Sequence, residues 1–303
     1  MKSILIAGGT GFIGYHLSKK CIKMGWKVTS ISSKKPKKKR KIKKVIYVTC
    51  SLINKKNIYK KIRKNYDYVV NLSGHVDHKN KTKTLNSHYK SVKNLVEFFI
   101  SRNKPIKKFI QMGSSAEYGG LTKPQKETVK CVAKSFYGKA KLASTRYLIK
   151  QHKLKKFPVT IFRLYQAYGP NQDINRLIPI VINACKRNQD FNCSDGDQFR
   201  DFVYIDDIVN AIIKSIKIKN QEGQIFNLGS GKALQVKKII STISNFFKGG
   251  KPLYGKIKLR KDESKIIYAN IDKIKNNLKW KPQVKFKNGL KRTMNFYKEN
   301  NEI

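Results

Sequence analysis

The hydrophobic positions along the chain alternate between short apolar runs and longer segments with helical spacing. The run at residues 3–7 is continuous, as in a strand buried on both faces, and residues 12–25 follow with a helical pattern that Gly25 closes. Strands that alternate with helices indicate a parallel sheet covered on both faces. The further strands expected in this part of the chain are 28–31, 45–48, 68–72, 109–112 and 159–164, and the further helices are 54–65, 84–102 and 135–152.

The pattern is less regular beyond residue 170. The elements expected there are a strand at 224–228, helices at 175–188, 206–218, 236–247, 271–278 and 288–299, and a loop at 192–199. The predicted fold class is α/β: a Rossmann-type doubly wound parallel sheet with a smaller α/β C-terminal substrate domain. We place the first domain at residues 1–165, with part of 203–230 returning to it, and the second domain mainly at 166–303.

Three glycines lie where the first expected strand meets the first helix. Gly8, Gly11 and Gly14 have the Gly-x-x-Gly-x-x-Gly spacing, which permits a tight turn and the close approach of a phosphate. The pyrophosphate of a dinucleotide would then face free N–H groups at the helix N-terminus. The position between a strand and a helix supports this interpretation. We expect Gly8, Gly11, Phe12, Ile13 and Gly14 to bind a dinucleotide.

The residues after the second expected strand bear on which dinucleotide is bound. An acid there would bind the ribose 2′-hydroxyl and favour NAD, but the chain has Ser32, Ser33, Lys34 and Lys35. Hydroxyls followed by cations suit a 2′-phosphate. We therefore expect Ser32, Ser33 and Lys34 to contact NADP(H), with NAD(H) as the alternative. The basic run at 34–44 is also compatible with a solvated loop.

Tyr137 and Lys141 are the candidate catalytic pair. Their separation of four residues places both on one face of a helix. An ammonium near a phenol favours the phenolate, which allows a tyrosine to exchange a proton near neutral pH. The same Tyr-x-x-x-Lys spacing occurs at three other places, so the spacing alone carries little weight. Tyr137 differs because Ser114 precedes it at the end of an expected strand, where open parallel sheets bind ligands.

The net charge of +49 bears on the choice of partners. Lysines are 57 of the 67 basic residues and are spread along the whole chain, whereas arginine is the usual choice for bidentate phosphate and base recognition. We interpret the charge as a solvated surface that steers anionic substrates, with no specific nucleic-acid partner.

The five cysteines include no Cys-x-x-Cys pair, which fits reduced thiols in the cytoplasm. A strand that begins at residue 3 leaves no room for a signal peptide, and no apolar stretch is long enough to span a membrane. We therefore expect a cytoplasmic protein. Two histidines and an aspartate are close together in Gly74-His75-Val76-Asp77-His78, but without a distant partner ligand we expect no metal.

Several motifs in one order resemble the extended short-chain dehydrogenase/reductase family, of the NAD(P)-dependent epimerase/dehydratase type that acts on nucleotide sugars, nearest to its 4-keto reductases. The motifs are GGTGFIG at 8–14, NLSG at 71–74, GSSAEYG at 113–119, YGKAK at 137–141, RLYQAYGPNQ at 163–172, RDFVYIDDIV at 200–209 and LKWKPQV at 278–284. The resemblance covers nearly the whole chain. It implies that 166–303 mainly binds the nucleotide sugar, and that a homodimer forms through helices 84–102 and 135–152.

The resemblance also implies a role for each matching residue. Tyr137 is the expected acid/base, Lys141 its partner and a ribose ligand, and Ser114 the second hydroxyl on the substrate oxygen. The residues implied to line the cofactor site beside them are Leu72, Ser73 and Gly74. The implied substrate-binding residues are Ser115, Glu117, Gln166, Arg176, Arg200 and Arg260.

Some positions depart from the family pattern. Ser115 and Ala116 stand where the 4,6-dehydratases have Asp-Glu, and elimination of water needs that second acid, so a dehydratase is not expected. Gln166 and His88 each replace a common Asn. Glu117 either contacts the sugar or caps a loop.

The expected function is NADPH-dependent reduction of a nucleotide-linked 4-keto-6-deoxy sugar in surface-polysaccharide precursor synthesis, in which Tyr137 protonates the oxygen at C4. The alternative is a UDP-sugar 4-epimerase that keeps NAD bound and uses the same residues reversibly. A third hypothesis, from another class, is a non-catalytic dinucleotide-binding regulatory or scaffold protein. The complete set of Ser114, Tyr137 and Lys141 argues against it.

Overall fold

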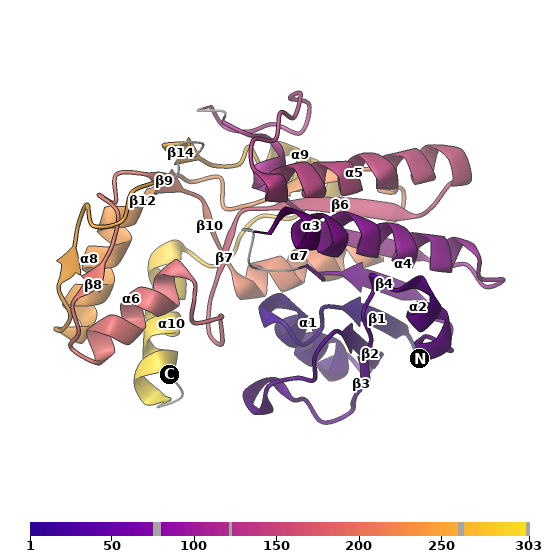
Figure 1. Cartoon of the computed structure of the whole chain (residues 1–303), viewed down its shortest axis with the longest axis horizontal. Helices are drawn as coiled ribbons and strands as arrows, with labels where there is room; N and C mark the ends of the chain where they lie inside the picture. Colours follow the sequence, from indigo (N-terminus) through magenta and orange to yellow (C-terminus); the bar gives the residue numbers. More distant parts are fainter. Residues whose placement is uncertain (75–79, 121–122, 260–263, 301–303) are drawn as a thin grey trace.

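The computed structural model describes residues 1–74, 80–120, 123–259 and 264–300. Its largest element is a parallel sheet of seven strands in the order β11-β6-β5-β4-β1-β2-β3 (Figure 1). The strands are β1 (Ser3–Ala7), β2 (Lys27–Ser32), β3 (Val45–Thr49), β4 (Tyr68–Asn71), β5 (Lys108–Ser114), β6 (Val159–Leu164) and β11 (Ile225–Leu228). The predicted α/β class with a Rossmann-type sheet is confirmed.

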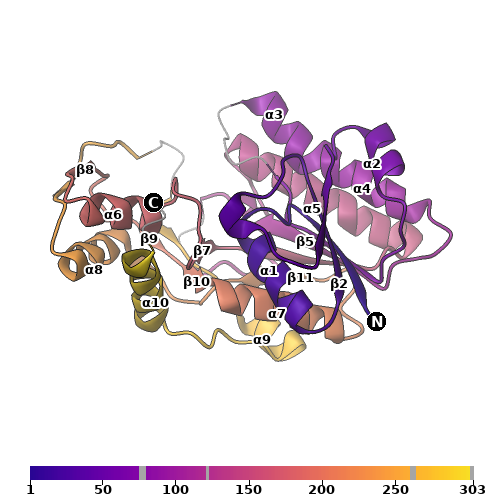
Figure 2. The same ribbon diagram turned by 90° about the horizontal axis from the view of Figure 1, so that it is seen from below.

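Helices cover both faces of this sheet (Figures 1 and 2). On one face lie α1 (Phe12–Lys23) and α7 (Ile205–Lys217), and on the other lie α2 (Lys55–Lys61), α4 (Ser91–Ile100) and α5 (Phe136–Lys155). The central strands are apolar on both faces because each face packs against helices. Ile4 and Ile6 join one buried cluster, whereas Leu5 and Ala7 join the other.

A smaller lobe stands beside the sheet and contains α6 (Leu177–Lys186), α8 (Val236–Phe247) and α10 (Phe286–Glu299) (Figure 1). The parallel pair β7 (Gln166–Tyr168) and β10 (Phe202–Tyr204) lies between the two parts. After this pair the chain returns to the sheet, where α7 packs beside α1, β11 pairs with β6, and α9 (Asp272–Leu278) packs against both α7 and β11. The lobe also holds β8 (Phe191–Asn192), β9 (Phe199–Arg200), β12 (Leu234–Gln235), β13 (Pro252–Leu253) and β14 (Ile266–Ile267).

Two predicted helices were wrong in their bounds, and the predicted loop at 192–199 was wrong at its ends. The expected helix 54–65 is shorter in the structure, where it is α2 alone. Asn54 is the N-cap residue of this helix. The expected helix 84–102 is instead α3 (Lys81–Leu85), a π-helical segment (Asn86–Lys90) and α4. Such π-helical segments are rare, usually interrupt an α-helix for a single turn, and are frequent at functional sites. Both ends of the predicted loop lie in the short strands β8 and β9.

Asp67, which directly precedes β4, is hydrogen-bonded to the first residue of β1. We therefore expect the stability of the fold to depend on pH. Burial alone would raise the pKa of Asp67, but hydrogen bonds from Ser3 N and Oγ (2.8 Å each) and the Lys107 ammonium (3.0 Å) lower the pKa to about 2. A depressed folded-state pKa gives stability that is present above about pH 4 and lost as the pH falls toward 2. We expect Asp67→Asn to lower the free energy of unfolding by about 1–2 kcal/mol at neutral pH. Urea unfolding across pH should show the difference shrinking in acid; a pH-independent difference would contradict the assignment.

Candidate active site

The glycine turn joins β1 to α1 and leaves the helix N-terminus open. Gly8 has a φ of +79°, and a Cβ there would lie 2.9 Å from Leu72 C and Ser73 N at the end of β4. A Cβ on Gly14 would overlap the carbonyl oxygen of Gly8. Gly11 is the N-cap of α1 and supplies no side-chain hydrogen bond, so it leaves the first N–H groups of the helix available to an anion.

The end of β2 lies directly beside this turn. Ser32 Oγ accepts a hydrogen bond from Thr10 N at 3.4 Å, whereas Ser33 and Lys34 are exposed. The basic run that follows is not a uniformly solvated loop, because the Arg40 side chain is only 4% exposed. This buried arginine was missed at the sequence level.

Tyr137 and Lys141 lie at the carboxyl end of β5, on the first turns of α5. The Lys141 Nζ donates to Met112 O at 2.8 Å and lies 5.9 Å from the centroid of the Tyr137 ring. Gly138 allows this approach, because a Cβ there would overlap Ala116 O in the turn after β5. The absence of a side chain at Gly138 therefore brings α5 and its tyrosine against the end of the strand.

His88 connects the tyrosine to the end of β4. Its ring packs edge-to-face on Tyr137, with centroids 5.0 Å apart and planes at 80°. A Cβ on Gly74 would overlap the His88 imidazole. The residues after β4 thus touch the glycine turn at Leu72 and Ser73. Through Gly74 and His88 they also reach the Tyr137 ring. The carboxyl ends of β1, β4 and β5 gather these side chains at one edge of the sheet, where such sheets bind ligands.

Ser114 is held by a reciprocal capping arrangement. Its Oγ accepts from Ala116 N at 3.2 Å, and its N–H donates to Glu117 Oε1 at 2.9 Å. The Glu117 carboxylate is fully buried and also accepts hydrogen bonds from Arg163 Nε at 3.0 Å and Thr145 Oγ1 at 2.9 Å. Glu117 therefore caps the turn after β5, which is the second of the two roles that the sequence left open for it.

The other predicted substrate residues are distributed unevenly. Ser115 is half-buried beside Ser114, and Gln166 and Arg176 are exposed, the latter at the N-cap of α6. Arg200 is buried in β9, where its guanidinium donates to Phe199 O at 2.8 Å and Lys265 O at 3.2 Å. Arg260 lies outside the described residues, as do His75, Asp77 and His78.

Asp201 follows Arg200 and has a structural role that the motif did not reveal. Its carboxylate accepts hydrogen bonds from Ser230 N and Oγ, Gly231 N and Ala269 N. Burial raises the pKa of this carboxyl, although these donors act in the opposite direction. The aspartate thereby ties the end of β9 to the segment after β11 and to the segment after β14.

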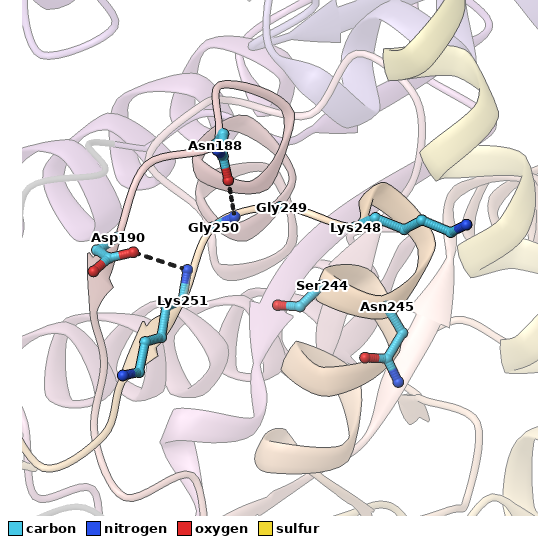
Figure 3. A pocket seen from close by; sticks show the side chains of 8 residues that line it. All are labelled: Asn188, Asp190, Ser244, Asn245, Lys248, Gly249, Gly250 and Lys251. Carbon is cyan, nitrogen blue, oxygen red and sulfur yellow. Dashed lines mark hydrogen bonds between the residues drawn. The ribbon is translucent and has the colours of Figure 1, made fainter.

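A separate hollow lies in the smaller lobe, between the ends of α6 and α8 (Figure 3). Asn188 Oδ1 accepts from Gly250 N at 3.1 Å, and Asp190 Oδ1 accepts from Lys251 N at 3.1 Å. These side chains therefore close the turn after α8, and we assign the hollow no functional role.

Within the described ranges, no cluster of three or more His, Cys, Asp or Glu side chains could hold a metal ion. Over the same part of the chain, no helix has the length and apolarity needed to cross a membrane.

The sheet order, the glycine turn and the Tyr137–Lys141 pair define a dinucleotide-dependent α/β enzyme. A family model described as the NAD dependent epimerase/dehydratase family matches residues 4–229, and the chain belongs to this family. It is therefore an NAD(P)-dependent enzyme that modifies nucleotide sugars, and the predicted family is confirmed.

Individual relatives show the range of activities in the family. The chain is 29% identical to a putative UDP-glucose 4-epimerase of Methanocaldococcus jannaschii, over 98% of this chain and 99% of that one. It is 25% identical to the CDP-abequose synthase of Salmonella muenchen, over 97% of each. A UDP-glucuronic acid 4-epimerase of Bacillus cereus, solved with UDP-glucuronic acid and NAD, has the same fold, with a TM-score of 0.88 and 23% identity over 98% of this chain and 99% of that one.

Proposed function

We propose that this enzyme is a 4-epimerase of UDP-linked sugars that keeps its dinucleotide bound between turnovers. The observation that carries the proposal is the Lys141 ammonium beside the Tyr137 ring, fixed by Met112 O at the strand edge that also holds the glycine turn. Similarity over the full length to a putative UDP-glucose 4-epimerase supports the substrate class. The order of the two hypotheses from the sequence, in which the reductase stood first, is thereby reversed.

The glycine turn suits a dinucleotide because a Cβ at Gly8 or Gly14 would fill the space that close approach requires. The pyrophosphate would be held by the N–H groups of residues 12–14 at the start of α1, since the Gly11 N–H donates to Gly8 O at 3.0 Å within the turn. The other residues proposed to hold the dinucleotide are Gly8, Ser32, Ser33, Lys34, Leu72, Ser73, Gly74, Tyr137 and Lys141. When bound, the dinucleotide supplies the hydride acceptor and donor for reversible oxidation at C4.

The protein supplies the proton transfer. Tyr137 accepts the proton of the C4 hydroxyl when the sugar is oxidised and returns it to the same oxygen after the sugar has presented its other face. The Lys141 ammonium stabilises the phenolate between these two steps. Ser114 donates a hydrogen bond to the same oxygen and holds it within reach of the phenol. Because proton and hydride both leave and return, the sugar changes configuration without net oxidation.

The second candidate is NADPH-dependent reduction of a nucleotide-linked 4-keto sugar. Two observations favour it: Ser32, Ser33 and Lys34 replace the acid that binds the ribose 2′-hydroxyl in NAD enzymes, and a reductase-like relative, CDP-abequose synthase, matches over nearly the full length. The same Tyr137 and Lys141 would protonate the C4 oxygen once per turnover.

The nucleotide that co-purifies with the protein separates the two candidates. We expect mass spectrometry of the denatured protein to identify NAD, and the protein to interconvert UDP-glucose and UDP-galactose with no net change in nicotinamide absorbance. An empty protein that consumes NADPH in proportion to an added 4-keto sugar would reverse the ranking. A nucleotide-sugar panel with both reduced dinucleotides is the matching control.

A further inference from the structure

We propose that Arg40 is a dinucleotide-retention residue, which ties the glycine turn to the smaller lobe through an ion pair with Asp173. Arg40 is the single arginine in the basic run at 34–44, whose other cations are all lysines. Its side chain is 4% exposed, whereas that of Asp173 is 35% exposed. The inference rests on the proposed use of a bound dinucleotide.

The Arg40 guanidinium contacts two parts of the fold at once. Its NH2 donates to Asn171 O at 2.5 Å and to Asp173 Oδ1 at 2.9 Å, both in the segment that leads into α6. Its NH1 donates to Thr10 O at 3.5 Å, inside the glycine turn. Thr10 is also the residue whose N–H meets Ser32 Oγ. The guanidinium therefore joins the glycine turn, and through Thr10 the end of β2, to the segment that leads into the smaller lobe.

The segment at 170–173, which carries two acceptors of Arg40, is held in place by further contacts. Asn171 has a φ of +61°, and His16, on the helix that follows the glycine turn, lies 2.9 Å from Pro170 O. Tyr297 of α10 donates to Gln172 O at 3.1 Å. Residues of α1 and α10 thus hold the segment at 170–173 through neutral hydrogen bonds. The Arg40–Asp173 pair adds an ionic link between this segment and the basic run.

Asp173 is needed because Arg40 is buried in a chain of high positive charge. A buried guanidinium without a partner anion is strongly unfavourable, and the neighbouring lysines of the run repel it. A planar guanidinium can bond two acceptors in one direction and a third in another, which a lysine ammonium on a flexible stem does less well. The pair therefore favours one closed position of the loop, and a dinucleotide held by the turn and by Ser32 leaves only when that position opens.

The test compares dissociation of bound dinucleotide in three variants. We expect Arg40→Ala and Asp173→Asn each to release the dinucleotide about 10- to 100-fold faster than the wild type, since interface changes act mainly on dissociation rates. Lys41→Ala removes one exposed positive charge from the same loop without touching the pair, and we expect a change of less than about twofold. The release rate is measured in protein loaded with reduced dinucleotide, to which an excess of NAD is added. The fluorescence of the bound reduced dinucleotide then decreases at the rate at which it dissociates.

Each outcome decides a different claim. Equal release rates in wild type, Arg40→Ala and Asp173→Asn would overturn the retention role and leave the proposed function intact. If Lys41→Ala accelerated release as much as the others did, total charge would be the cause and the ion pair would be rejected. A wild type that binds neither NAD nor NADP would overturn the proposed function and this inference together. Asp173→Asn keeps an acceptor at the more exposed end of the pair, so it remains informative if Arg40→Ala does not fold.

Discussion

Tyr137→Phe is expected to lower kcat by about 10²–10⁴-fold, the range over which a positioned acid/base accelerates proton transfer. The variant lacks only the phenolic oxygen, so the ring contact with His88 and the position of Lys141 on Met112 O are preserved. Dinucleotide content and the affinity for the nucleotide sugar should stay close to the wild type. Steady-state rates with the active nucleotide sugar and mass spectrometry of the retained dinucleotide give both quantities.

A matched control exists in the same chain. Tyr254 is followed by Lys258 at the same spacing, but it lies in the smaller lobe with Lys237 over its ring. Tyr254→Phe should therefore keep full activity. If the two variants behaved alike, or if Tyr137→Phe retained most of the wild-type rate, the assignment of Tyr137 as acid/base would be rejected.

Gly14→Ala is expected to abolish retention of the dinucleotide, with a loss of affinity of at least about 100-fold, equivalent to about 3 kcal/mol. The added methyl group would meet the carbonyl oxygen of Gly8 and the backbone of Gly9, which are fixed atoms of the turn. In an exposed helix the same change would stabilise by about 1 kcal/mol, so the loss cannot come from helix propensity.

The control for Gly14→Ala is Lys20→Ala, at an exposed position of α1. It should leave the dinucleotide content unchanged. Equilibrium dialysis with labelled NAD measures the affinity, and thermal unfolding without dinucleotide reports whether the turn still folds. A Gly14→Ala protein that is folded and binds NAD as the wild type does would show that the turn is not the pyrophosphate site.

The sequence predicted the sheet because its central strands are buried on both faces. The runs at 3–7 and 159–164 are mainly apolar and coincide with β1 and β6. The strands of the smaller lobe could not be found in this way, since β8 and β9 have two residues each and present no periodicity. The break in the expected helix 84–102 was also missed, because its apolar spacing continues through the π-helical segment.

The candidate site was predictable where a motif is local and not where burial depends on distant residues. Gly8, Gly14 and the Tyr137–Lys141 pair were identified from neighbours in the sequence. Arg40 was hidden among lysines, and its burial depends on Asp173, which lies 133 positions away. The only available signal was the exchange of one lysine for arginine in the run, a residue suited to buried ion pairs.

The capping role of Glu117 was hidden for the same reason. Its position after Ser114 suggested either a sugar contact or a loop cap, and the partner that decides between them, Arg163, lies 46 residues away on β6. A fully buried carboxylate paired with a buried arginine is a structural ion pair.

The most direct test of the central claim follows a deuterium label at C4 of UDP-glucose by NMR and mass spectrometry. The account predicts UDP-galactose that retains deuterium at C4, with no net change in dinucleotide oxidation state, and product formation about 10²–10⁴-fold slower with Tyr137→Phe. Conversion by the Tyr137→Phe variant at the wild-type rate, or product from the wild type that has lost the label to solvent, would contradict it.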